Sequence, residues 1–117
     1  MTQEEFRKEM DVYWGSMREE AMSLKDPFVV VEKLHALYQK FSADERNMAD
    51  RVIAEWVLEN DEIRRWDALA LIDNLKIVRA VPALRALEKR LAQSIGPDDS
   101  FWAGRAGQLA DSLQKRT

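Results

Sequence analysis

The sequence predicts an all-α protein of about six antiparallel helices. Apolar residues recur at steps of three and four along almost the whole chain, which is the spacing of one face of an α-helix. Helix-start signatures and turn residues separate these stretches at regular distances. No stretch alternates apolar and polar residues as a half-buried strand does, and the strand-like run from Phe28 to Val31 follows a strong helix start. Because every connection is short, neighbouring helices are expected to run antiparallel.

The first two helices are predicted between Thr2 and Phe41. Thr2 and Glu5 form a capping box, in which the hydroxyl and the carboxylate each satisfy a backbone N–H at the helix start. The inward positions of this first helix are Phe6, Met10, Tyr13, Met17, Ala21 and Leu24. The second helix is expected to start at Asp26 as N-cap, with Pro27 in its first turn, where a missing N–H costs nothing. Its inward positions are Val30 or Val31, Leu34, Leu37 or Tyr38, and Phe41.

The third and fourth helices are predicted on either side of a break at Asn60 and Asp61. Ser42 and Glu45 form a second capping box that marks the start of the third helix. Its inward positions are Met48, Val52, Ile53, Trp56 and Val57. Asp61 is placed to cap the fourth helix. The inward positions of that helix are Ile63, Trp66, Leu69, Ile72 and Leu75.

The last two helices are predicted on either side of the clearest turn in the sequence, Gly-Pro-Asp-Asp at residues 96–99. The fifth helix is expected to begin near Ala80, with Pro82 in its first turn. Its inward positions are Val81, Leu84, Leu87, Leu91 and Ile95. Those of the sixth helix are Trp102, Ala106, Leu109 and Leu113. Lys115 and Arg116 follow, and their positive charges suit the negative end of the helix dipole.

The bulk properties predict one cytoplasmic domain over residues 1–117. A chain of this length buries a core without disulfides or metal, and the absence of cysteine suits a reducing compartment. No apolar run approaches the roughly 18 residues of a membrane span, and the charged start has no signal-peptide core. The net charge of −3 is compatible with a protein partner and disfavours nucleic acid, whose binding domains are usually basic.

One segment, RWDALALIDNLKIVRAVPALRALEKRL at residues 65–91, resembles the HEAT-like repeats of bacterial helical-repeat proteins. In these repeats a first helix with Arg, Ala and Leu along one face meets a second that begins Ala-Val-Pro-Ala-Leu. The matching positions are Arg65, Ala68, Ile72, Leu75 and residues 80–84. The chain departs from the pattern at Asp73, where Gly is common, and at residues 76–78, where Gly-Asp-Pro is usual. There Ile77 and Val78 either plug the end of the hairpin or form a small exposed contact.

The resemblance implies helices stacked as α-hairpins, with residues 62–95 as the best-matching repeat. Only this unit matches well, so we expect a compact helical bundle or short α-solenoid closed by degenerate terminal helices. In such stacks the second helices of the hairpins, the third and fifth of the chain, often line the binding side. The partner-binding residues predicted on them are Asn47, Asp50, Arg51, Glu55, Arg85, Glu88 and Lys89. The alternative is a solvated face of ion pairs within each helix.

No catalytic or metal-binding pattern stands out in the sequence. His35 is the only histidine, which excludes paired imidazole ligands, and a surface or core-edge role is favoured for it. The acidic pairs at residues 61–62 and 98–99 stand at helix starts, where Asp is expected as a cap. Glu19 and Glu20 point about 100° apart on a helix and share no site. We therefore predict no enzyme activity, cofactor or metal.

The four tryptophans are predicted to be mainly core residues. Trp56 and Trp66 fall on the inward positions of adjacent helices, so we expect them to pack together. Trp14 and Trp102 lie nearer the ends of the helical array, where we expect one of the two to be partly exposed.

The function predicted from these observations is that of a non-catalytic protein-binding module. By size and fold analogy it resembles bacterial immunity proteins, which neutralise a cognate toxin by covering its active site. The alternative is a nucleic-acid-binding helical-repeat protein, which the acidic charge balance disfavours. An enzyme accessory with a small pocket between helices is the least favoured hypothesis, because no catalytic pattern supports it.

Overall fold

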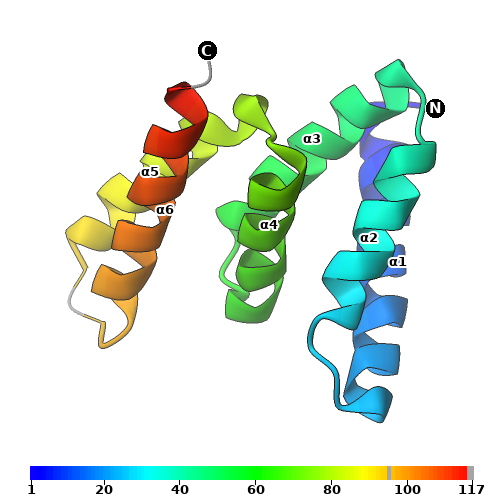
Figure 1. The fold of residues 1–117 in the computed structure, drawn as a ribbon, viewed down its shortest axis with the longest axis horizontal. Helices are drawn as coiled ribbons and strands as arrows, with labels where there is room; N and C mark the ends of the chain where they lie inside the picture. Colours follow the sequence, from blue (N-terminus) through cyan, green and yellow to red (C-terminus); the bar gives the residue numbers. More distant parts are fainter. Residues whose placement is uncertain (95, 116–117) are drawn as a thin grey trace. The chain divides into compact units, whose positions relative to one another are not determined.

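The computed structural model describes residues 1–94 and 96–115, and over these residues the chain is all-α (Figure 1). It contains six α-helices, one short 3-10 helix and no strand within that part of the chain, which confirms the predicted fold class. The elements are α1 (Gln3–Leu24), α2 (Val29–Lys40), α3 (Ala43–Val57), α4 (Glu62–Leu75), η1 (Val78–Ala80), α5 (Val81–Ala92) and α6 (Asp99–Gln114). Ile95 and Arg116, for which positions were predicted, lie outside the described residues.

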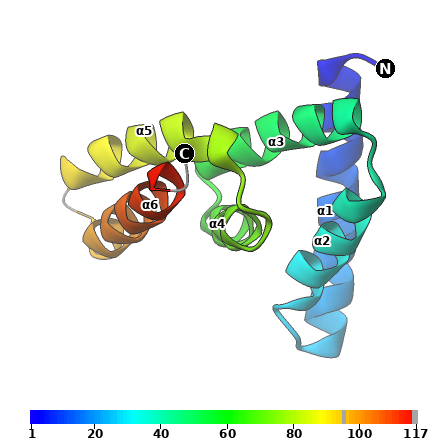
Figure 2. The ribbon, with the colours of Figure 1, turned by 45° about the horizontal axis from the view of Figure 1, so that its top comes forward.

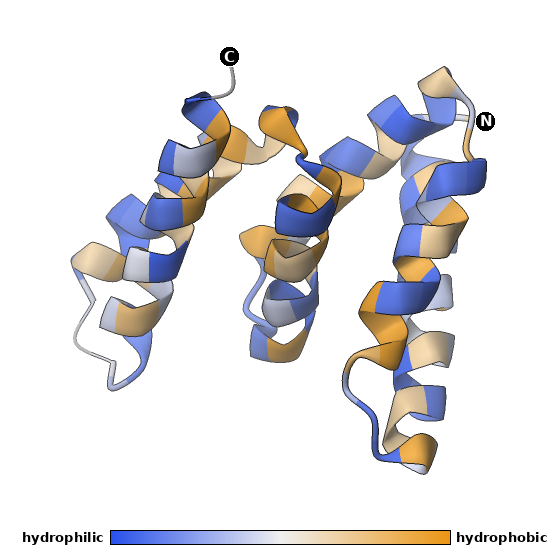
Figure 3. Ribbon diagram, in the orientation of Figure 1, coloured by the Kyte–Doolittle hydropathy of each residue, from blue (hydrophilic) through white to orange (hydrophobic). Residues whose placement is uncertain are grey.

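Two compact units divide the chain, residues 1–52 and residues 53–117, and each is described by itself. The whole net charge of −3 belongs to the first unit, because residues 53–117 hold equal numbers of acidic and basic side chains. Hydrophobic and hydrophilic residues interleave along each helix in both units (Figure 3). None of the described helices is both long enough and apolar enough to cross a bilayer.

The first unit begins with the predicted capping box. The Glu5 N–H donates to Thr2 Oγ1 at 3.1 Å, and the Thr2 hydroxyl donates to Glu5 Oε1 at 3.0 Å. The buried face of α1 consists of Phe6, Met10, Trp14, Met17 and Ala21. Tyr13 and Leu24, predicted inward, are exposed. The prediction was wrong there because Trp14 occupies the centre of the buried face, which leaves Tyr13 at its edge.

Helix α2 starts later than the sequence predicted. Asp26 does not cap it directly; its carboxylate accepts the Phe28 N–H at 3.0 Å, and the helix begins at Val29. The reason is the end of α1, where Lys25 takes the left-handed conformation with a φ of 54° and the chain needs the next residues to turn back. The buried face of α2 is Val29, Val30, Val31 and Leu34, and it packs against α1 (Figure 2).

Helix α3 starts at the second predicted capping box. The Glu45 N–H donates to Ser42 Oγ at 3.2 Å, and the Ser42 N–H donates to Glu45 Oε1 at 2.9 Å. The predicted inward positions Val52, Ile53, Trp56 and Val57 are buried, and Met48 is half-buried. Arg46 closes the preceding connection by donating to the carbonyls at the end of α2. The sequence therefore predicts this helix correctly.

The inward face predicted for helix α4 is correct at Leu69 and Ile72 and wrong at Ile63 and Trp66. Asp61 caps it as expected, with its carboxylate accepting the Arg64 N–H at 3.0 Å. Ile63 and Trp66, predicted inward, are exposed. The buried residues are Arg65, Asp67, Ala68, Leu69, Leu71 and Ile72. Because the Arg65 guanidinium binds carbonyls at the end of α3, the neighbouring residues on the helix turn outward.

The connection to α5 contains the apolar pair Ile77 and Val78, for which the sequence left both a buried and an exposed position open. Ile77 is buried and its N–H donates to Ile72 O at 3.1 Å, whereas Val78 is exposed. Ile77 is therefore a core residue of this connection, and Val78 is a surface residue. Pro82 stands in the first turn of α5 as predicted, and the predicted positions Leu84, Leu87 and Leu91 are buried.

Helices α5 and α6 pack closely along their lengths (Figure 2). All four inward positions predicted for α6 are buried: Trp102, Ala106, Leu109 and Leu113. Small residues make the close approach possible, and a Cβ atom at Gly107 would collide with the carboxylate of Glu88 on α5. Alanine and glycine at the seam of two helices bring their backbones together in this way.

Candidate functional site

The predicted partner-binding residues of the first unit lie on α3 and differ in exposure. Arg51 is exposed and Asn47 is half-buried. Asp50 is only 8% exposed, and its Oδ1 accepts the Tyr38 hydroxyl at 2.7 Å. The Asp50 carboxylate thus links α3 to α2, so of the three residues Arg51 is the one most available to a partner.

The predicted partner-binding residues of the second unit divide in the same way. Glu55 and Lys89 are exposed, whereas Arg85 and Glu88 are half-buried. The Arg85 guanidinium donates to Glu88 Oε1 at 3.2 Å, to Asp111 Oδ1 at 2.5 Å and to Gln114 Oε1. The bond to Asp111, followed by that to Glu88, raises the pKa of Arg85 above its usual value. This network joins α5 to α6, so its charges hold the fold together.

A second group of arginines lies at the C-terminus of α3. Arg65 Nε donates to Val57 O at 3.2 Å and its Nη2 donates to Glu59 O at 2.9 Å. Arg90 Nη1 donates to Leu58 O at 3.1 Å. Burial lowers the pKa of Arg65 from its usual value, and the nearby charge of Arg90 lowers it further. These cations neutralise the negative end of α3.

The same contacts determine where positive charge reaches the surface of the second unit. Arg65 is buried, so the sequence neighbours Arg64 and Arg65 do not form a continuous basic surface with the later lysine and arginine residues. Arg64 also pairs with Glu59 at 2.9 Å.

The tryptophans are arranged differently from the prediction. Trp56 is fully buried, but Trp66 is 47% exposed, so the predicted core pair of Trp56 and Trp66 is wrong. Trp14 and Trp102 are both buried, although one of them was expected to be partly exposed. The outward turn of α4 that follows from the burial of Arg65 accounts for the exposure of Trp66.

Exposed aromatic side chains gather on α4 and α6 in the second unit. The Trp66 ring meets the Trp102 ring edge to face, with centroids 6.0 Å apart, and the Phe101 ring meets Trp102 at 5.5 Å. Trp102 is buried beneath them, with the Arg65 guanidinium 5.8 Å from its ring centroid. Ile63 is exposed one turn before Trp66 on α4. We call Ile63, Trp66, Phe101 and Trp102 the aromatic surface.

The geometry of the aromatic surface suits a contact with another molecule. Phe101 is 56% exposed, so two large rings project to solvent from a fixed base. An ion pair between Arg105 and Asp73 at 3.6 Å joins the same two helices. Aromatic groups held rigidly at a surface lose little conformational entropy on binding and often dominate the binding energy.

Sequence reasoning missed this surface, although one signal pointed to it. The HEAT-like pattern places Arg65 and Ala68 on the inward face of their helix, and an inward Arg65 requires its neighbour Trp66 to turn outward. The spacing of apolar residues along the helix assigned Trp66 to the core. That spacing considers apolar residues alone, so it cannot show that an arginine such as Arg65 is buried.

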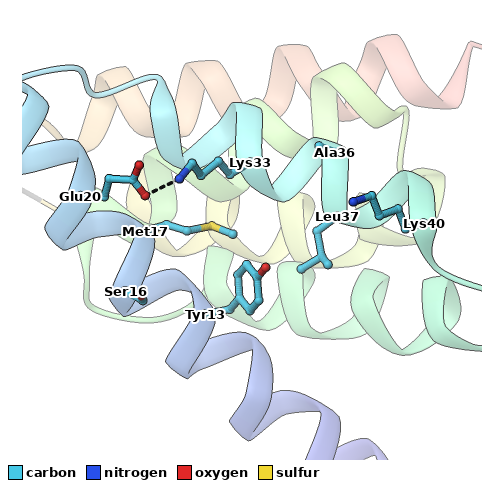
Figure 4. A pocket seen from close by; sticks show the side chains of 8 residues that line it. All are labelled: Tyr13, Ser16, Met17, Glu20, Lys33, Ala36, Leu37 and Lys40. Carbon is cyan, nitrogen blue, oxygen red and sulfur yellow. Dashed lines mark hydrogen bonds and ion pairs between the residues drawn. The ribbon is translucent and has the colours of Figure 1, made fainter.

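A groove lies between α1 and α2 in the first unit (Figure 4). Its larger part has a volume of about 390 Å³, and a smaller part of about 130 Å³ continues toward α3. Tyr13 and Leu37 line both parts. Glu20 and Lys33 form an ion pair across the larger part, and Lys40 lies on the same rim as Lys33.

His, Asp and Glu side chains are the groups of the chain that could ligate a metal ion. Within residues 1–94 and 96–115, no three His, Cys, Asp or Glu side chains are placed to hold a metal ion together. His35 lies on α2 with its Nε2 atom 3.4 Å from Gln39 Nε2.

Comparisons with known proteins add no relative. No family model, curated protein or solved structure matches the chain. The HEAT-like resemblance of residues 65–91 stays a prediction, and function is argued from the surfaces described above.

Proposed function

We propose that the chain is a non-catalytic protein-binding module and that the aromatic surface is its binding site. The observation that carries this proposal is the exposure of Trp66 and Phe101 against the buried Trp102. Exposing large aromatic rings to water is unfavourable, and such rings at a fixed position commonly mark the centre of a protein interface. A partner that covers them gains apolar burial without first having to order the site.

The proposal includes the HEAT-like hairpin of α4 and α5. Two features within the second unit support it: the buried Arg65 and Ala68, and Pro82 in the first turn of α5. They stand at positions of the repeat pattern where a helix seam and a helix start are needed. Trp66 lies on the exposed side of α4, opposite these contacts.

Within this class, we propose an immunity protein or inhibitor that neutralises a cognate toxin in the cytoplasm. An exposed aromatic surface provides a contact area for another molecule, and the size of the chain suits a one-to-one inhibitor. Three of the predicted partner-binding residues are exposed, namely Arg51, Glu55 and Lys89. Their charges then steer the association with the partner. The aromatic surface supplies the apolar contact.

A capture experiment with matched variants tests the proposal. Tagged wild-type protein, the double variant Trp66→Ala/Phe101→Ala and the control Phe28→Ala are incubated with lysate of the native cell, with and without nuclease treatment. Phe28 is an aromatic residue of comparable exposure in the first unit, so it controls for the loss of exposed apolar area. We expect wild type and control to recover the same protein, and the double variant to recover at least about tenfold less. Circular dichroism verifies that each variant is folded.

Two results would contradict the proposal. Equal recovery by the double variant would remove the aromatic surface from the binding site. Retention of nucleic acid alone, abolished by nuclease, would favour the nucleic-acid alternative. If a toxin is recovered, co-expression with the wild-type chain is expected to restore growth of toxin-producing cells, and the double variant is expected not to restore it.

A further inference from the structure

We propose that the groove between α1 and α2 is the interface of a homodimer, in which α1 of one copy lies against α2 of the other. The groove is confined to the first unit, whereas the aromatic surface belongs to the second. The dimer is therefore independent of the proposed partner binding, and each proposal can fail without the other.

The floor of the groove is apolar, and of its residues Leu37 and Phe41 are half-buried while the others are buried. It consists of Phe6, Met10, Met17, Leu37 and Phe41. Tyr13 stands between the two parts of the groove and is 47% exposed, and its neighbour Val12 is also exposed. Both residues line a further apolar hollow on the outer side of α1. Flexible methionines and an exposed tyrosine adapt readily to a facing surface.

The two rims of the groove carry opposite charges. Glu9 and Glu20 lie on the α1 side, and Lys33 and Lys40 lie on the α2 side. All four side chains are exposed. A partner segment with charges of one sign would be attracted to one rim and repelled by the other. A second copy of this chain can place its basic rim over the acidic rim of the first copy and its acidic rim over the basic rim. Opposite charges then meet on both sides of the groove.

Two-fold symmetry determines how the second copy must lie. An axis parallel to the helices places α1 of each copy over α2 of the other, so that Glu20 faces Lys33 of the second copy and Lys33 faces its Glu20. An axis across the helices would place α1 against α1 and bring glutamates together. The charge pattern thus selects the first arrangement, in which the Glu20–Lys33 pairs of two copies form one alternating cluster.

Charge reversal on each rim tests the dimer directly. Glu20→Lys makes both rims basic at this point, and Lys33→Glu makes both acidic. We expect the wild type to sediment with about twice the 13.6 kDa of one chain, and each variant to sediment as a monomer because like charges then face each other. An equimolar mixture of the two variants is expected to recover the dimer mass, since a fully basic groove meets a fully acidic one.

Two further variants separate the interface from the fold. Tyr13→Ala removes apolar contact at the centre and is expected to weaken the dimer by about tenfold or more. Glu32→Lys, on an exposed position of α2 outside the groove, is the matched control and is expected to leave the dimer unchanged. A monomeric wild type, a dimer that persists in both reversal variants, or a variant mixture that stays monomeric while both variants are folded would each overturn the proposal.

Discussion

The two helix pairs α5–α6 and α1–α2 differ in how completely the side chains fill the space between the helices. Between α5 and α6 the seam is closed, and small buried residues of α6 allow the approach: Ala103, Ala106, Gly107 and Ala110. Between α1 and α2 the seam holds Tyr13, Met17 and Leu37 and leaves a groove of about 390 Å³. The size of the side chains at the seam decides whether two helices close completely.

The comparison shows where each unit leaves surface available for binding. In the second unit, Arg85 and Arg65 bind groups of the same chain, so its free surface is the set of aromatic rings that those contacts turn outward. In the first unit, the paired Glu20 and Lys33 lie at the surface of a groove that Tyr13, Met17 and Leu37 leave between α1 and α2. Binding surfaces are therefore expected where packing or pairing within the unit is incomplete.

The largest effect is expected from a cavity in the closed seam. Leu109→Ala removes a fully buried side chain between α5 and α6 and is expected to lower the free energy of unfolding by about 2–5 kcal/mol. Leu37→Ala in the open seam is expected to cost less than about 1.5 kcal/mol, because its side chain is already half exposed. Urea denaturation of dilute protein, which keeps the chain monomeric, measures both. Equal costs would show that the two seams are packed alike.

A smaller effect is expected from the arginine that caps α3. Arg65→Met keeps the length of the side chain but removes the hydrogen bonds to Val57 O and Glu59 O, so we expect a loss of about 2 kcal/mol in unfolding free energy. Arg51→Met on the exposed face of α3 is the control and is expected to change stability by less than about 0.5 kcal/mol. If Arg65→Met proved neutral, its buried contacts would not be what orients α4.

The smallest effect is expected at the helix caps, where the units are alike. Ser42→Ala at the start of α3 and Asp61→Ala at the start of α4 each remove one side-chain acceptor from a backbone N–H. Each is expected to cost about 1 kcal/mol in a thermal or urea unfolding experiment. A cost at only one of them would mean that one helix start is held by packing instead of by its cap.

Local signals in the sequence predicted much of the fold. The capping boxes at Thr2 and Ser42, the cap at Asp61 and the placement of Pro82 depend on residues within one turn, and all are present. The start of α2 was misplaced because the left-handed Lys25 ends α1 in a way that the sequence does not signal. The sequence therefore predicts the start of a helix more reliably than its end when no glycine marks that end.

The candidate surfaces could be predicted less well, for a physical reason. The outward position of Trp66 follows from the binding of Arg65 to carbonyls of another helix, which an apolar stripe does not encode. The charges of Arg85 and Glu88 were predicted on a partner-binding face, and their links to α6 depend on which helix packs beside α5. The groove likewise depends on the contact of α1 with α2.

Oxidative footprinting of Tyr13 and Trp66 tests most directly the claim that surfaces of incomplete packing are the binding surfaces. The oxidation rate of each side chain is measured over a range of protein concentrations, with peptides resolved by mass spectrometry. We predict that the oxidation rate of Tyr13 falls as the chain dimerises, whereas Trp66 stays reactive until the captured partner is added and then becomes protected. Constant labelling of Tyr13 at all concentrations, together with undiminished labelling of Trp66 in the partner complex, would contradict the account.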